Sequence, residues 1–275
     1  MKIKNIIIYT CERKKELDNL SDIKEIVKDE PIKKETTAKK KTHPLKTIKT
    51  LCRNKYFILI TLAFAVIYTS LGLTGGSRIY YAKYVLGDEM LNSTMTMFNY
   101  IPTILTIMLI PVFTKRFGKI KALFVGFLFY AAGLVLEIAG PVNLPMIYTG
   151  LVLQGIGHAA LYSCLFAIVG DVVDYSEWKD GIREEGITYS VTSFGQKIGT
   201  GLGTAALGWI LAAGHYDGTA AVQSASAIFA IKGLFLYLPL VITVIVLIIW
   251  YLFMGIDKIY PTVRKELDER REKAE

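Results

Sequence analysis

A single lysine, Lys197, lies in a stretch that is otherwise free of charge between residues 187 and 213. It follows Gly186 by 11 residues, which corresponds to about 16 Å along a helix at about 1.5 Å per residue. A lysine at the centre of a membrane costs at least about 2.5–3.5 kcal/mol on insertion scales, so it must face protein or a watery cavity. We interpret Lys197 as a polar group in a path through the membrane. The alternative is a side chain that snorkels to an interface.

The residues around Lys197 define two faces of a helix. Ser193 and Gln196 fall on the lysine face, with Tyr189 one turn further back. The opposite face carries small residues spaced by four, at Gly195, Gly199 and Gly203. Such spacing allows a neighbouring helix to approach closely. The stretch therefore predicts a polar face towards a cavity and a packing face towards another helix.

A second polar stripe is formed by Gln154, His158 and Tyr162, which are spaced by four residues. Lipid offers these groups no hydrogen-bond partner, so they must face either other helices or water. Two interpretations stay open: hydrogen bonding between helices within the bundle, or the lining of a cavity.

Acidic residues cluster where this second stretch ends. Asp171, Asp174 and Glu177 are spaced by three residues, and Arg183 and Glu185 follow them. The dipole of a helix disfavours anions at its C-terminus, so we expect these acids to be paired with Lys or Arg. A breakable network of ion pairs suits a gate, and an ordinary solvated loop is the alternative.

The elements that position these residues are long apolar runs. Fifty-two per cent of the residues are hydrophobic, and the mean hydropathy is +0.40. A helix needs about 20 apolar residues to cross about 30 Å of hydrocarbon. We predict an all-α membrane protein with six transmembrane helices, in which Pro102 and Pro111 are kink points of the second. The expected spans cover residues 56–77, 90–114, 120–139, 145–170, 187–213 and 233–254.

The charges indicate the topology. Sixteen Lys or Arg residues precede Tyr56, four lie in residues 115–121, two in residues 171–185 and six follow Gly255. The opposite loops hold only Arg78, Lys83 and, at a helix edge, Lys232. This is the positive-inside pattern, and it predicts a multi-pass protein of the plasma (inner) membrane with both termini in the cytoplasm. The expected connections are a cytoplasmic linker at 18–55, outer loops at 78–89 and 215–230, a cytoplasmic loop at 171–186 and a cytoplasmic tail at 255–275.

Other classes of function find no support in the sequence. The net charge of +8 follows from the topology, and no basic face is interleaved with stacking aromatics, so we expect no nucleic-acid partner. His43, His158 and His215 fall in different compartments and cannot converge on a metal. No catalytic triad pattern is present. We expect neither an enzyme nor a resident cofactor or metal.

The stretch D-V-V-D-Y-S-E-W-K-D-G-I-R-E-E-G-I-T-Y-S from Asp171, continued by F-G-Q-K-I-G to Gly199, resembles the glycoside–pentoside–hexuronide:cation symporters of the major facilitator superfamily. Basic clusters before the first span and at residues 116–119 support the resemblance, which covers essentially the whole chain.

Members of this family have twelve helices in two halves of six, with the sugar held between the halves. The resemblance implies that this chain is the C-terminal half of such a major facilitator fold. Residues 1–17 would be the end of a preceding, truncated helix, and the coupling Na⁺ or H⁺ would be bound mainly by the missing N-terminal half. Lys197 would be the lysine of the eleventh helix, flanked in the cavity by Ser193 and Gln196. Tyr162 falls where the family places a sugar-stacking tryptophan. The charged motif would help close the cytoplasmic gate.

The function implied is cation-coupled symport of a sugar or glycoside, present as one half and inactive alone. Its partners would be the lipid bilayer, the substrate and a separately encoded N-terminal half. Two alternatives stay open: a non-transporting membrane remnant or assembly partner of another chain, and a six-helix transporter that works as a homodimer.

Overall fold

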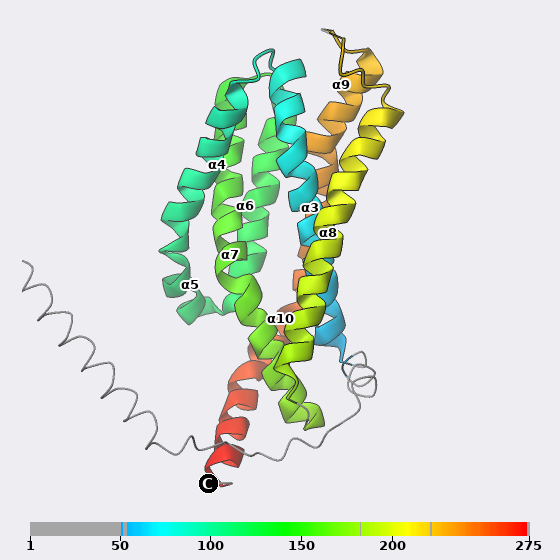
Figure 1. Cartoon of the computed structure of the whole chain (residues 1–275). Coiled ribbons are helices and arrows are strands. Elements are labelled where there is room, and N and C mark those ends of the chain that lie inside the picture. The colour runs from blue at the N-terminus through cyan, green and yellow to red at the C-terminus, as the bar shows by residue number, and fades with distance from the viewer. Residues whose placement is uncertain (1–50, 52–53, 182, 221, 274–275) are drawn as a thin grey trace, which may run out of the picture. The chain divides into compact units, whose positions relative to one another are not determined.

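A computed structural model describes Leu51 and residues 54–181, 183–220 and 222–273, and these residues contain helices and no strand. Figure 1 shows the long helices running side by side along one common direction. In chain order they are α3 (Lys55–Tyr84), α4 (Leu91–Ile107), α5 (Ile110–Phe117), α6 (Lys119–Ala139), α7 (Leu144–Asp180), α8 (Glu185–Ala213), α9 (Ala225–Lys232), the π-helical turn η1 (Gly233–Tyr237) and α10 (Leu238–Glu272). The predicted segment 1–17 and nearly all of the linker 18–55 lie outside the described residues.

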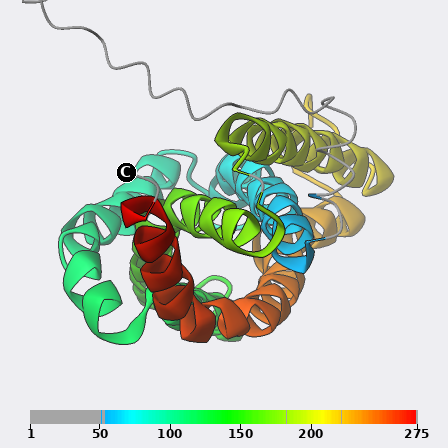
Figure 2. The same cartoon turned by 90° about the horizontal axis from the view of Figure 1, so that it is seen from below.

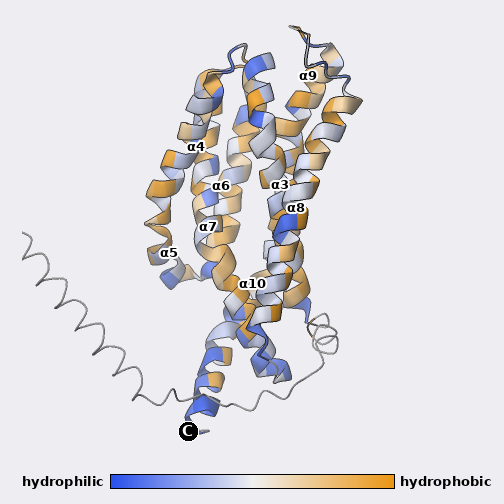
Figure 3. Cartoon of the chain, in the orientation of Figure 1, coloured by the Kyte–Doolittle hydropathy of each residue, from blue (hydrophilic) through white to orange (hydrophobic). Residues whose placement is uncertain are grey.

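The helices have the length and composition of membrane spans. Among the described residues α3, α6, α7 and the continuous helix Ala225–Glu272 are long and apolar enough to cross a membrane, and α4 with α5 makes a fifth candidate. Each of the six predicted spans coincides with one of these helices or with α8, which does not reach the same apolar measure because it carries Lys197 and many hydroxyl side chains. The all-helical membrane class is confirmed. Figure 3 shows polar residues gathered at the lower ends of α7 and α10, below the apolar part of the bundle.

The second span is bent. The axes of α4 and α5 differ by 55°, and the break falls at residues 108–109. Pro111 lies in the first turn of α5, and because it has no N–H it cannot donate a hydrogen bond to the preceding turn. The expected kink at Pro111 is therefore confirmed, whereas α4 continues through Pro102.

At the end of the bundle expected to face outwards, the helices are longer than the apolar runs indicated. The expected loop 78–89 is wrong over 78–84, because α3 continues to Tyr84. This last part of α3 packs well, since Tyr81 is fully buried with its ring 4.4 Å from that of Phe235. The expected loop 215–230 is shorter too, because α9 begins at Ala225 after a cap by Ser224.

At the opposite end of the bundle, on the side expected to be cytoplasmic, the helices also extend beyond their apolar parts. The predicted loop 171–186 shrinks to residues 181–184, because α7 continues to Asp180 and ends at Gly181, whose φ of 66° is the left-handed conformation that suits glycine. The predicted tail is helical to Glu272, because the buried side chains Val263 and Leu267 give it an apolar face within the core. The apolar runs therefore underestimated the lengths of α7 and of the last helix, α10.

Glycines set the closest helix contacts. Gly195, Gly199 and Gly203 of α8 lie against the backbone of α3. The carbonyl oxygens of Ala65 and Thr69 leave no room for a Cβ at Gly199 and Gly203, and that of Thr61 would lie only 3.2 Å from a Cβ at Gly195. The packing face predicted from the spacing of four is confirmed. Packing is extensive between α3 and α8, between α6 and α7 and between α4 and α7, but sparse between α7 and α8. Helix α10 touches α3, α6 and α7 and joins the two groups.

Candidate functional site

A groove on α8 contains two of the predicted cavity residues. Lys197 and Ser193 line it together with Tyr189, Ser190 and Phe194, and its volume is about 420 Å³. Both predicted side chains are exposed in this chain, on the face away from the glycines that contact α3. Gln196 is half-buried and lies outside the lining of the groove. The structure thus brings Lys197 and Ser193 together on a surface that α3 leaves open.

The stripe on α7 divides into a buried and an exposed part. Gln154 is 5% exposed, and its Nε2 donates to Oε1 of Glu137 on α6 at 2.6 Å. His158 Nδ1 lies 3.2 Å from Asn99 Oδ1 on α4. For these two residues the structure shows the hydrogen-bonding alternative. Tyr162, by contrast, is 44% exposed, with its ring beside that of His158.

Two ionisable residues inside the bundle escaped the interpretation of the sequence. Glu137 is fully buried near the C-terminal end of α6. Arg78 was assigned to an outer loop but lies on α3, where its Nη1 donates to Thr96 Oγ1 at 3.1 Å. An acidic residue within an apolar run is the same signal that singled out Lys197, so Glu137 could have been found from the sequence.

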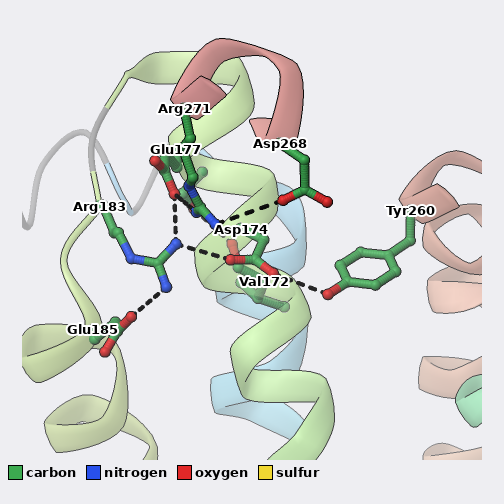
Figure 4. A network of polar contacts seen from close by, with 9 residues as sticks. Val172, Asp174, Glu177, Arg183, Glu185, Tyr260, Asp268 and Arg271 are labelled. Carbon is green, nitrogen blue, oxygen red and sulfur yellow. Dashed lines mark hydrogen bonds and ion pairs between the residues drawn. The ribbon is translucent and has the colours of Figure 1, made fainter. Parts of the chain in front are cut away.

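The predicted acidic cluster forms an ion-pair network around Arg183, which Figure 4 shows from close by. Arg183 Nη1 lies 3.0 Å from Asp174 Oδ1 and 2.5 Å from Glu177 Oε2, and its Nη2 pairs with Glu185. Two of these acids lie on the last turns of α7 and one on the first turn of α8. Although its partial burial alone would lower it, the pKa of Arg183 is raised by the carboxylates of Glu177, Glu185 and Asp174. The network therefore joins the ends of two helices across their short connection.

Helix α10 completes this network. Arg271 Nη2 lies 3.0 Å from Glu177 Oε2, and the Tyr260 hydroxyl donates to Asp174 Oδ2 at 2.9 Å. These partners were missed because residues 255–275 were expected to be a tail. Figure 2, the view from below, shows the ends of α7 and α10 close together.

The fifth predicted acid, Asp171, belongs to a separate contact. It is 5% exposed and pairs with Lys119 at the start of α6, with 2.6 Å between Lys119 Nζ and its Oδ1. Asp257 of α10 completes the same corner, where its Oδ2 accepts hydrogen bonds from the backbone N–H groups of Ile120 and Lys121 at 3.1 and 3.3 Å. A carboxylate at a helix N-terminus is favourable because unpaired N–H groups and the positive end of the dipole meet there.

All these ionic contacts connect helices of this same bundle. They hold α6, α7, α8 and α10 together at one end of the bundle, and the polar groove on α8 lies further along the bundle towards its other end. Such an arrangement can fix a rigid base under a membrane-level polar surface, but it contains no set of groups for covalent chemistry.

Comparison with known proteins identifies the class. The sequence matches the MFS/sugar transport protein family over residues 23–258. This chain belongs to that family.

The curated relatives are transporters. The chain is 31% identical over 242 residues to the isoprimeverose transporter of Lactiplantibacillus pentosus, an alignment that covers 86% of this chain and 49% of the relative. It is 26% identical over 227 residues to the glucuronide carrier protein homolog of Escherichia coli (strain K12), covering 82% and 50%. It is 26% identical over 231 residues to the uncharacterized symporter YjmB of Bacillus subtilis (strain 168), covering 81% and 49%. The chain thus spans about half the length of the curated relatives it matches.

Proposed function

We propose that this chain forms one six-helix half of a cation-coupled symporter for a sugar or glycoside. The substrate would lie between its open polar face on α7 and α8 and a complementary half. The single observation that carries the proposal is the exposed groove at Lys197 and Ser193, which faces away from the rest of its own bundle. Family membership and the names of the relatives support sugar transport.

Within this proposal the open face has distinct roles. Lys197 and Ser193 would donate hydrogen bonds at membrane depth, and Gln196 would support them from the edge of the groove. Tyr162 would stack on the apolar face of a sugar ring and hydrogen-bond through its hydroxyl. Rocking of the two halves around this site would expose it alternately to each side, driven by Na⁺ or H⁺.

The ionic network would serve the cytoplasmic gate indirectly. Asp174, Glu177, Arg183 and Glu185 pair with one another and with α10, so they would keep the ends of α7, α8 and α10 in one piece while the halves rock. Asp171 would do the same for α6 through Lys119. We further propose that the protein resides in the plasma membrane with both termini in the cytoplasm.

Uptake of radiolabelled sugar tests the proposal. Cells would express this chain alone, a complementary N-terminal half of a relative alone, and both together, with membrane insertion verified in each case. We expect uptake only when both are present. Uptake by this chain alone would replace the half-transporter with a homodimer, and no uptake in spite of good insertion would favour a non-transporting remnant.

A further inference from the structure

The carboxyl group of Glu137 is buried with too few partners. It lies two residues before the end of α6 and is 0% exposed. Its Oε1 accepts from Gln154 Nε2, whereas its Oε2 is buried with no hydrogen-bond partner among the described residues. An ionised carboxylate has lone pairs for about four hydrogen bonds. The described residues around Glu137 provide one such hydrogen bond.

An ionised carboxylate in this position would be costly. Removing a charge from water costs several kcal/mol even after relaxation, unless a close counter-ion and further hydrogen bonds compensate. Arg78 is the cation close to Glu137, but within the described residues it forms no ion pair with it: it donates to Thr96, and its own Nε is buried without a partner. A bound proton is therefore the simplest way to neutralise the carboxyl.

Gln154 can serve the carboxyl in both of its forms. A side-chain amide has both a donor and an acceptor, and its two ends exchange by a flip. Its NH₂ group can donate to an ionised Glu137, and its oxygen can accept from a protonated one. The separation of 2.6 Å places the amide and the carboxyl in direct hydrogen-bond contact, whichever way the amide is turned.

The other groups around Glu137 offer little positive charge to neutralise an ionised carboxylate. Arg78 and Tyr81 approach from α3, Tyr130 lies two turns earlier on α6, and His158 lies one turn beyond Gln154 on α7. On α4, Tyr100 lies on the side of Arg78, and on η1, Tyr237 lies on the side of Tyr81. The charged groups that α10 and α5 bring to α6 lie at its other end, about 25 Å away at about 1.5 Å per residue. Arg78 is thus the one cation among these neighbours.

We propose that Glu137 is a proton-binding site within this half of the bundle, with Gln154 as its hydrogen-bond partner in both protonation states. The proton leaves to water, and the freed carboxylate then pairs with the guanidinium of Arg78. That this proton is the ion coupled to sugar movement rests on the proposed transport function. The proton site itself does not.

Infrared spectroscopy of the full chain, purified in lipid nanodiscs, tests the site directly. The infrared spectrum of the wild type minus that of Glu137→Gln should show the carbonyl band of a protonated carboxyl group at neutral pH. This band should disappear from the spectrum of the wild type at alkaline pH. The matched control Glu89→Gln removes an exposed glutamate that pairs with Lys83, and it should leave the band in place. Absence of the band at neutral pH, or a band that persists at every pH, would overturn the proposal.

Two further measurements distinguish a failure of the proton-site proposal from a variant that does not fold and from a failure of the transport proposal. If Glu137→Gln does not fold, as judged by gel filtration and circular dichroism, Glu137→Asp should keep the band but shift its frequency, and an unshifted band would assign it to another residue. In the assembled transporter, Glu137→Gln should lose uptake driven by a proton gradient but keep exchange of labelled for unlabelled sugar. Retained gradient-driven uptake would refute the coupling. If wild type and variant both fail to transport, the half-transporter is refuted, while the infrared band still decides the proton site.

Discussion

Alanine at Gly199 should destabilise the bundle, while alanine two residues away at Gly201 should not. A Cβ at residue 199 would meet the carbonyl oxygen of Ala65 and lie 3.1 Å from Thr69 N, both backbone atoms of α3. At residue 201 a Cβ would meet nothing within 4 Å. The two sites lie on the same helix and differ only in what faces them.

The magnitude follows from the difference between the two variants. Replacing glycine by alanine within a helix gains up to about 1 kcal/mol of helix propensity at either position, so this contribution cancels. What remains is the cost of overpacking at residue 199, typically about 1–3 kcal/mol. No side chain can rotate away, because the obstacle is the backbone of α3, and the helices must separate by about 1 Å to restore contact at about 3.5 Å. We therefore expect Gly199→Ala to be less stable than Gly201→Ala by about 1–3 kcal/mol.

Equilibrium unfolding of the purified chain in mixed micelles of dodecyl maltoside and sodium dodecyl sulfate measures this difference, with far-ultraviolet circular dichroism as the signal. The readout does not require transport. Equal unfolding midpoints, or a higher midpoint for Gly199→Ala, would refute the inference that α3 and α8 are held in backbone contact.

Three other changes have defined outcomes. Lys197→Cys in the assembled transporter should impair sugar uptake, whereas Lys232→Cys at the end of α9 should not; unchanged uptake and cation dependence would remove Lys197 from the cavity. Arg183→Gln should speed hydrogen exchange at the end of α7 in low salt and remove the salt dependence of that exchange. The reason is that salt weakens ionic contacts, since the Debye length falls from about 10 Å at 0.1 M to about 3 Å at 1 M. An unchanged salt dependence would show that contacts other than those of Arg183 protect the end of α7. Asp257→Asn should lower the free energy of unfolding by up to about 1 kcal/mol and Asp257→Ala by more, because only the amide retains an oxygen for the N–H groups of α6; equal losses would show that charge alone matters.

The helices and their packing face could be predicted from the sequence because the signals are local. Apolar length located most of the long helices among the described residues but missed α9, and the spacing of four at Gly195, Gly199 and Gly203 identified the face of α8 that contacts α3. Helix ends were placed less well. Tyr81 and Val263 are buried beyond the apolar runs by contacts with distant segments, which no local window of sequence reveals.

The polar sites were only partly predictable for the same reason. The spacing of Asp174 and Glu177 indicated ion pairs, and Arg183 supplies them across a four-residue connection. Arg271 is 94 residues away from Glu177 in the sequence, so its part in the network depends on the path of α10. Likewise, Gln154 could be recognised as a polar group in a span, but its partner Glu137 depends on how α6 and α7 align.

The sparse packing between α7 and α8 has a mechanical consequence. Helices α3 and α8 form one stiff slab through their glycine contact, and α4, α6 and α7 form another. Helices α7 and α8 make few contacts with each other, while Arg183 links the end of α7 to the start of α8 and α10 packs against both slabs. A force on the exposed face of α7 and α8 would therefore tilt one slab against the other about the end that Arg183 holds together. The distance between α7 and α8 would then vary most at the level farthest from Arg183.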